Sequence, residues 1–461
     1  MRQLLIICLL FNGIWLAYSQ EAQVDTLHYT GPVENRLNIV ILGDGYLEDR
    51  AEQFAQHTQN ATLDLFDEFP FKNYQGYFNV FSIFLPSNAS GAARTPQQLI
   101  DNQYGSTFYY AGIERLLVPT KPERVTEVLT EYFPSFDQVI MLVNTGRYGG
   151  SGGWIATSSI HEEAGEIILH ELGHSFGDLA DEYWAGSQYA RETYNMTRES
   201  SESRVSWKNW LGDFTVGHYP YPANNNWYKP HQNCKMEYLG SRFCSVCAEQ
   251  LIRTIQRNVL AVDQFSPIEQ VVGNDPIRFE VQPVEPRPNT MKIQWELDDE
   301  LIAENQNVVE IDPTNLDGSF HEVQASIIDT TKYDRRDNIW VNRVTWTIGN
   351  GLSSELDRDQ IERERDQILS VKASQTDQWG IALFPNPVTD LVTILYDVQI
   401  TSPMQVVLTD VNGQLIQSFE FLPMNTGPQS FQIDMSSYEK GLYIITIKYE
   451  GIVHGFKTIK N

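Results

Sequence analysis

Residues 170–174 read His-Glu-Leu-Gly-His, and residues 175–183 continue as Ser-Phe-Gly-Asp-Leu-Ala-Asp-Glu-Tyr. Residues four apart lie on the same face of a helix, so the imidazoles of His170 and His174 come side by side. Two adjacent imidazoles are what two corners of a tetrahedral zinc site require. Glu171 projects beside them, where a carboxylate can take the proton of a metal-bound water. This stretch therefore predicts a zinc site with its own general base.

The residues around the histidines predict a helix independently of the metal. Ser159, followed three residues later by Glu162, has the pattern of a capping box. Gly177 is suited to end the helix in a left-handed conformation. The buried face is supplied by apolar residues, namely Ile167, Ile168 and Leu172. The alternative is an ordinary helix that carries two histidines and a glutamate, because this short motif also occurs by chance.

The run HELGHSFGDLADEY, residues 170–183, resembles the zinc signature of the IgA-peptidase-type family of secreted metallopeptidases, a relative of the metzincins. The similarity covers about residues 38 to 260. It implies an α+β protein with a metzincin-like catalytic domain, built from a mixed sheet and a zinc-binding helix. The chain pattern is consistent with this order, with strands at 37–42, 78–85 and 136–143 and an amphipathic helix at 51–65.

A glycine-rich stretch, residues 149–153, leads into a short strand at 154–158 just before the zinc helix. In metallopeptidases of the family that the chain resembles, this strand is the sheet edge that pairs with extended substrate, and edge pairing supplies main-chain hydrogen bonds. A flexible turn is the alternative. The glycines are not followed by the lysine-serine or lysine-threonine pair of a phosphate loop, and we expect no organic cofactor.

The third zinc ligand is where the chain departs from the common metzincin pattern, which places a histidine or an aspartate three residues after the glycine. That position is Ala180, which cannot bind a metal. The next residue, Asp181, is the predicted ligand, since a turn after Gly177 can absorb one inserted residue. Glu182 is the alternative, as a ligand or as a partner that orients a histidine.

The same resemblance implies a methionine turn beneath the zinc, with Met236 as the candidate. Tyr238, two residues further on, matches the tyrosine that stabilises the oxyanion in some metzincins. The long polar and aromatic segment at 184–233 is expected to form the lower half of the cleft, with some rings in substrate pockets and others in the core.

Three cysteines remain after removal of a signal peptide: Cys234, Cys244 and Cys247. In an exported protein, this number predicts one disulfide and one free thiol, and the pairing stays open. The alternative is a structural zinc site, because His231 and the three cysteines have ligand-like spacings.

The rest of the chain predicts an exported protein of several domains. Residues 1–19 have the pattern of a signal peptide, and no later stretch is apolar enough for a membrane span in the mature form. The predicted units are a catalytic domain at 20–262, an immunoglobulin-like β-sandwich at 263–350, a charged linker at 351–378 and a second all-β unit at 379–461. The last unit resembles the C-terminal sorting domain of the type IX secretion system.

Charge narrows the range of partners. With 60 acidic and 33 basic residues the net charge is −27, which repels nucleic acid and anionic membranes. We therefore expect a bacterial protein that passes through the periplasm to the exterior or the cell surface, with the type IX secretion machinery as one partner and a protein or peptide substrate as the other. The predicted activity is a Zn²⁺-dependent endopeptidase in which His170, His174 and Asp181 hold the metal and Glu171 is the base. A non-catalytic surface binding protein of the same fold is the alternative.

Overall fold

The computed structural model describes residues 22–222, 224–266, 269–271, 276–312, 314, 316–317, 319, 321–336 and 341–349. In the C-terminal part it describes residues 382–384, 388, 391–398, 404–410, 415–421, 427–449 and 452–460. The predicted signal peptide and the predicted linker lie outside these ranges. Within them, no helix is long and apolar enough to cross a membrane.

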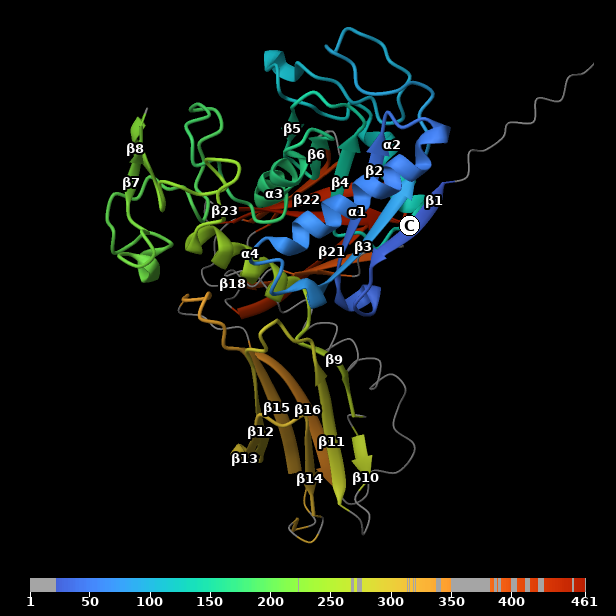
Figure 1. Ribbon diagram of the computed structural model, residues 1–461. Coiled ribbons are helices and arrows are strands. Elements are labelled where there is room, and N and C mark those ends of the chain that lie inside the picture. Colours follow the sequence, from blue (N-terminus) through green and yellow to red (C-terminus); the bar gives the residue numbers. More distant parts are fainter. Residues whose placement is uncertain are drawn as a thin grey trace, which may run out of the picture.

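A six-stranded mixed sheet forms the centre of the first unit (Figure 1). Its order is β1 (Gln23–His28), β3 (Phe78–Phe84), β2 (Leu37–Asp44), β4 (Gln138–Val143), β6 (Ile155–Ser159) and β5 (Gly150–Ser151). The four central strands run parallel, and the two outer strands, β1 and β5, run antiparallel to their neighbours. The predicted combination of a mixed sheet with helices is therefore present.

Helices cover both faces of this sheet. Alternate residues of β2 point to opposite sides: Ile39 and Ile41 belong to one apolar core, and Val40 and Leu42 to the other. The first core includes residues of α1 (Ala51–Asp67), α3 (Ala164–Ser175) and α4 (Ser245–Asn258), and the second includes residues of α2 (Pro122–Tyr132). Double coverage explains why β2, β3, β4 and β6 are buried along their whole length.

Helix α3 carries the motif, but its ends differ from the prediction. Ser159 is the last residue of β6, and the N-cap position is Glu163, whose backbone N–H donates to Nδ1 of His161 at 3.2 Å. At the other end, the left-handed residue is Asp178, with φ 51°, rather than Gly177. Gly177 is needed for space, because a Cβ there would lie 2.8 Å from the carbonyl oxygen of Gly173.

Four aromatic residues of the segment 184–233 belong to the core rather than to a cleft. The segment contains a small two-stranded sheet, β7 (Tyr219–Tyr221) and β8 (Asn224–Lys229). The buried rings are Trp207, Trp210, Tyr221 and Trp227. They support the chain around the site instead of lining a substrate pocket.

The second unit is a sandwich of two sheets around one apolar core. One sheet holds β10 (Glu269–Val271), β16 (Val341–Gly349), β15 (His321–Asp329), β12 (Met291–Leu297) and β13 (Glu300–Glu304). The other holds β14 (Val308–Ile311), β11 (Ile277–Pro283) and β9 (Val262–Phe265). Trp295 and Trp346 stack in the core with ring centroids 5.4 Å apart. The immunoglobulin-like assignment stays a prediction.

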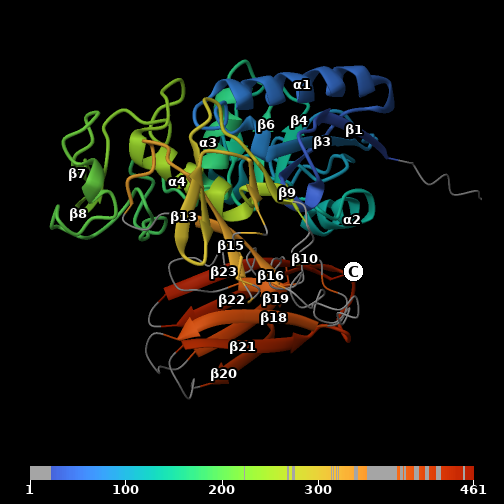
Figure 2. The same ribbon diagram turned by 90° about the horizontal axis from the view of Figure 1, so that it is seen from below.

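The C-terminal unit is also all β (Figure 2). One sheet holds β17 (Ala382–Phe384), β18 (Leu391–Val398) and β21 (Gly427–Asp434). The other holds β20 (Leu415–Phe421), β19 (Met404–Asp410), β22 (Gly441–Tyr449) and β23 (Ile452–Lys460). Buried residues of both sheets form one core, so this unit has the layered form expected of a small β-sandwich.

Candidate metal centre and active site

Three side chains from α3 and the turn after it converge on one point. The Nε2 atoms of His170 and His174 are 3.2 Å apart, and Oδ1 of Asp181 lies 3.2 Å from each of them. The i, i+4 spacing on the helix brings the two imidazoles together, and the turn through Asp178 returns the chain so that Asp181 can reach them.

Backbone carbonyls determine which nitrogen of each ring faces this point. His170 Nδ1 donates to the carbonyl of Lys235 at 2.9 Å, and His174 Nδ1 donates to the carbonyl of Leu179 at 2.8 Å. A carbonyl only accepts, so in the neutral rings Nε2 presents a lone pair. Oδ1 of Asp181 has no hydrogen-bond donor within the described part of the chain. Three acceptors that face one another require a cation.

The spacing fits a zinc ion. Nitrogen and oxygen ligands about 2.0–2.1 Å from a tetrahedral zinc lie roughly 3.3 Å from one another, and the three observed separations are 3.2 Å. Two imidazoles and one carboxylate leave the fourth position open, as in catalytic zinc sites. Burial lowers the pKa of His174, but the neighbouring Asp181 carboxylate outweighs it and raises that pKa to about 9, so a proton takes the cation's place when no metal is bound.

Buried groups hold the histidines from behind. Lys235 is fully buried, and its Nζ pairs with Glu166 at 2.5 Å and with Glu68 at 3.5 Å. These ion pairs fix the segment whose carbonyl orients His170. Met236 is also fully buried and packs against Gly173, where an added Cβ would lie 2.4 Å from the methionine sulfur. Met236 therefore packs against the motif, as the resemblance to the metzincins implies.

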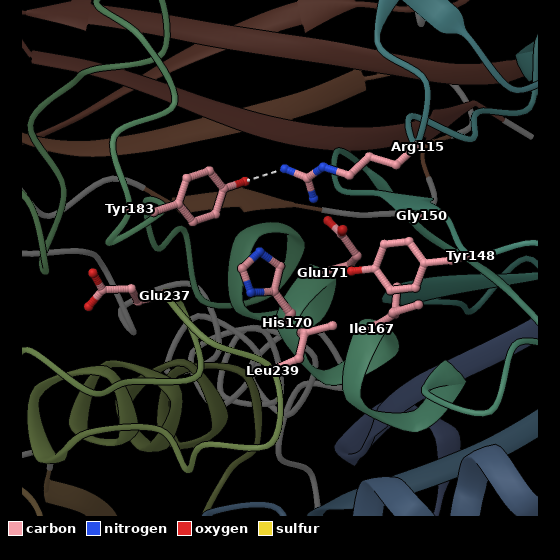
Figure 3. A pocket seen from close by; sticks show the side chains of 9 residues that line it. All are labelled: Arg115, Tyr148, Gly150, Ile167, His170, Glu171, Tyr183, Glu237 and Leu239. Atoms are coloured by element: carbon pink, nitrogen blue, oxygen red, sulfur yellow. Dashed lines mark hydrogen bonds between the residues drawn. The ribbon is translucent and has the colours of Figure 1, made fainter. Parts of the chain in front are cut away.

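Glu171 faces a cavity of about 240 Å³ beside the histidines (Figure 3). Burial raises the pKa of its carboxyl, while the neighbouring His170 and His174 act in the opposite direction. A carboxylate in this position can accept a proton from a water molecule in the cavity. The described residues that line the cavity are Arg115, Tyr148, Gly150, Ile167, His170, Glu171, Tyr183, Glu237 and Leu239.

Three side chains of the cavity that can donate hydrogen bonds were not predicted: Arg115, Tyr148 and Tyr183. Arg115 donates to the hydroxyl of Tyr183 at 3.2 Å, and both lie on the same side of the cavity as the Glu171 carboxylate in Figure 3. Burial and the nearby Asp181 raise the pKa of Tyr183 to about 12, so its hydroxyl stays protonated. Tyr183 is the last residue of the run 170–183 and Tyr148 directly precedes the glycines, whereas no signal marks Arg115.

Tyr238 is not brought into the cavity. Its neighbours Glu237 and Leu239 line it, but the side chain of Tyr238 is 54% exposed. The turn that contains Met236 therefore directs Tyr238 outward in this structure. Oxyanion stabilisation by Tyr238 thus remains a sequence prediction, and donors from other segments occupy the cavity.

The predicted substrate edge at 154–158 is wrong. Strand β6 lies inside the sheet, between β4 and the two-residue strand β5. The far side of β5 is also paired, because Gly150 exchanges backbone hydrogen bonds with Arg115 and Leu117. The glycines instead make room above the helix: a Cβ on Gly152 would lie 2.8 Å from Oε2 of Glu171 and 3.1 Å from the His174 side chain.

The cysteines do not form the predicted disulfide. Cys234, Cys244 and Cys247 are free and buried. His231 is not with them, since its Nε2 lies 2.7 Å from the Thr215 hydroxyl. Glu182 takes that place: Sγ of Cys247 donates to its Oε1 at 3.2 Å. The two adjacent carboxylates thus point to different sites, Asp181 to the histidines and Glu182 to the cysteines.

Two family models match the chain, one in its N-terminal half and one at its C-terminal end. Residues 26–223 match the family model described as IgA Peptidase M64, and residues 382–461 match that of a secretion system C-terminal sorting domain. No curated protein matches the chain.

Solved structures add little. Matches include the FN1–FN3 domains of chicken CNTN1, at 8% identity over 44% of this chain and 65% of that chain, with a TM-score of 0.14. Another is SGBP-B of the Bacteroides ovatus mixed-linkage glucan utilization locus, at 8% identity over 43% of this chain and 44% of that chain, also with a TM-score of 0.14. The chain thus spans less than two thirds of both structures, and scores this low carry no argument about function.

Proposed function

We propose that this chain, whose residues 26–223 belong to the IgA Peptidase M64 family, is a secreted zinc endopeptidase that uses Glu171 as its general base. The match to this family indicates a peptidase, and the match to the type IX sorting domain indicates a secreted or cell-surface protein. We add three points to these matches: the metal is zinc, Glu171 is the general base, and cleavage occurs within a peptide chain.

One observation carries the proposal: His170, His174 and Asp181 direct three acceptor atoms to one point, 3.2 Å from one another, beside the Glu171 carboxylate in a cavity. When bound there, Zn²⁺ supplies a Lewis acid that polarises a carbonyl and lowers the pKa of water. A histidine cluster with a purely structural role needs no carboxylate that faces a cavity, whereas hydrolysis needs such a carboxylate as its general base.

The residues of the chain would share the steps of hydrolysis as follows. His170, His174 and Asp181 hold the metal, and the Lys235 and Leu179 carbonyls keep the imidazoles in the correct tautomer. Glu171 takes a proton from the attacking water and later passes it to the leaving amine. Donors of the cavity, above all Arg115 and Tyr148, would stabilise negative charge on the carbonyl oxygen.

The test is a Glu171→Gln variant, which keeps the size of the side chain and the three ligands but removes the base. We expect the zinc content to persist and peptide hydrolysis to fall by about 10²–10⁴-fold, the usual contribution of a general base. The substrate is an internally quenched peptide library with acetylated and amidated ends, measured with and without a chelator. Cleavage of blocked peptides supports an endopeptidase, and cleavage only of peptides with a free end would contradict it.

The competing function is a surface protein that binds peptides and retains the fold without catalysis. Full activity in the Glu171→Gln variant would remove Glu171 from the mechanism. If purified wild-type protein with bound zinc cleaves no peptide in the library but binds some of them, the binding function is the correct one. Amide or ester hydrolysis on the same metal would be detected by small-molecule amides and esters in parallel.

A further inference from the structure

We propose that Glu182, Cys234, Cys244 and Cys247 form a second metal site, which holds a structural ion of the zinc class. This inference goes beyond the catalytic function, because none of the four residues lines the cavity beside Glu171. The site would stabilise the segments that position the catalytic ligands rather than contact substrate.

The four donor atoms have the spacing of a tetrahedral zinc site. They all lie within 4.8 Å of one another, with Sγ of Cys234 3.7 Å from Sγ of Cys247 and Oε1 of Glu182 3.2 Å from Sγ of Cys247. Zinc–sulfur bonds of about 2.3 Å imply sulfur atoms about 3.8 Å apart and an oxygen about 3.5 Å from each sulfur. A disulfide would require a sulfur separation of about 2.05 Å.

Burial supplies an independent reason for a cation. The Glu182 residue is 0% exposed, and its Oε2 has no hydrogen-bond partner within the described residues. Nζ of Lys229, the nearby cation, contacts the backbone carbonyl of Glu182 and the carboxylate of Glu237. A buried carboxylate among three thiols is costly unless it is neutralised, and a metal ion that binds the thiolates would also bind the carboxylate.

The backbone around the cysteines supplies groups that would stabilise thiolates bound to a metal ion. Cys244 is the N-cap residue of α4, and Cys247 lies in the first turn, where the positive end of the helix dipole stabilises negative sulfur. The backbone N–H of Cys244 donates to Sγ of Cys234 at 3.3 Å. Such hydrogen bonds to sulfur are the usual outer partners of a metal-bound thiolate.

The position of the cluster suggests its purpose. Glu182 follows Asp181, and Cys234 precedes Lys235, whose carbonyl orients His170. One ion would therefore join the turn after α3, the segment beneath the motif and the start of α4. The first of these segments is distant in sequence from the other two, and their mutual position decides where the proposed catalytic ligands meet.

The experiment counts metal ions in the full chain. Zinc is measured by mass spectrometry after dialysis against metal-free buffer, and we expect two ions per chain in the wild type. The His170→Ala/His174→Ala double variant should keep one. Replacement of that ion by Co²⁺ should produce a thiolate-to-metal charge-transfer absorption, which the catalytic site cannot give because it has no sulfur ligand. A double variant without metal, or without this absorption, overturns the proposal.

Variants of the four proposed ligands test whether the second ion is lost while the first is kept. Cys247→Ser and the milder Glu182→Gln should lose about one zinc ion, whereas His231→Ala, the control at the ligand predicted from sequence, should keep both. Alkylation of the unfolded, chelator-treated wild type should label Cys234, Cys244 and Cys247 alike, and protection of two of them by a disulfide contradicts the proposal. The outcome is separate from catalysis, because an inactive protein with two zinc ions would refute only the proposed function.

Discussion

At the scale of single residues, hydrogen-bond donors around the cavity determine where negative charge can be stabilised. Arg115 and Tyr148 line the cavity that Glu171 faces, whereas Tyr238 points to solvent. Burial raises the pKa of Tyr148, so its hydroxyl remains protonated and able to donate. We therefore expect the oxyanion donor to come from the segment before the glycines rather than from the turn after Met236.

We predict that Tyr148→Phe lowers kcat on a blocked peptide by about 10²-fold, with little change in KM, because a lost oxyanion donor weakens mainly the transition state. Tyr238→Phe is the matched control and should stay within about twofold of the wild type, since an exposed hydroxyl contributes little. The measurement is steady-state kinetics with zinc content verified for each variant. The opposite ranking of the two variants would restore Tyr238 as the donor.

A second residue-scale prediction concerns pH. His57 is half-buried, and its Nδ1 lies 2.8 Å from the hydroxyl of Tyr46. Burial lowers the pKa of His57 and raises that of Tyr46, so the tyrosine donates to a neutral imidazole. A histidine with a lowered folded pKa contributes stability above its unfolded pKa of about 6.5, and that stability is lost as the pH falls through the folded pKa.

The stability gap between the wild type and His57→Gln should therefore be largest near neutral pH and shrink below about pH 6.5. Thermal unfolding of both proteins at pH 7.5 and pH 5.5, with zinc held constant, measures this gap. A gap that grows on acidification would mean that the folded state favours the charged imidazole. The change is confined to stability, because His57 does not line the cavity beside Glu171.

Some residues of the candidate site were predictable from the sequence because their spacing along the chain determines where they lie. His170, Glu171 and His174 follow from the helical period, whereas Asp181 was chosen from the resemblance to the metzincin pattern, with one inserted residue absorbed by the turn after Gly177. Arg115 has no such signal, because long-range pairing with Gly150 brings it to the cavity. Glu182 was separated from Asp181 only by the structure, since adjacent residues in a turn point in directions that spacing does not reveal.

At the scale of elements, the glycine-rich stretch and α3 form one unit. A Cβ on Gly152 would lie 2.8 Å from Oε2 of Glu171 and 3.1 Å from His174. We predict that Gly152→Ala displaces these side chains and lowers kcat/KM on the order of a hundredfold, because small misplacements at reacting groups are costly. The fold should be retained, as measured by circular dichroism and by zinc content.

The control for this prediction is Gly146→Ala, because an added Cβ there meets nothing within 4 Å. It should leave kcat/KM within about twofold of the wild type, as expected for a surface substitution. Equal effects of the two alanines would mean that loop flexibility, and not the space above Glu171, limits the reaction.

Long periodic elements were predictable from sequence and short ones were not. The apolar runs and the amphipathic pattern gave β2, β3, β4 and α1 within a few residues. Strand β5 has two residues and no period, so the sheet edge was assigned to its neighbour β6. The start of α3 was missed because Ser159 has the residue type of a cap but lies in a strand, where sheet pairing takes precedence.

At the scale of the whole molecule, ion pairs and hydrogen bonds join the first unit, which contains the six-stranded sheet, to the sandwich of the second unit. Arg36 forms two hydrogen bonds of 2.6 Å with the carboxylate of Asp263 in β9. Tyr74 donates to Asp329 at 2.6 Å, and Arg253 of α4 pairs with Asp334 at 2.8 Å. None of the described residues of the sandwich lines the cavity beside Glu171, so the sandwich contacts the scaffold and not the cavity.

The last prediction tests this coupling with Asp263→Ala. The Arg36 side chain is only 3% exposed, and removal of its partner leaves a buried charge, which costs about 3 kcal/mol in similar cases. The free energy of unfolding should fall by that order, and the catalytic unit and the sandwich should begin to unfold separately in urea, followed by tryptophan fluorescence and limited proteolysis. Asp67→Ala is the control, because Asp67 pairs with Lys72 on the surface, where the two side chains are 82% and 59% exposed. Such pairs contribute about 0–1 kcal/mol, so this control should unfold like the wild type.

Both variants should retain kcat, because the metal ligands and Glu171 are held by α3 and its own neighbours. A loss of kcat in Asp263→Ala at full zinc content would instead make the sandwich part of the active site.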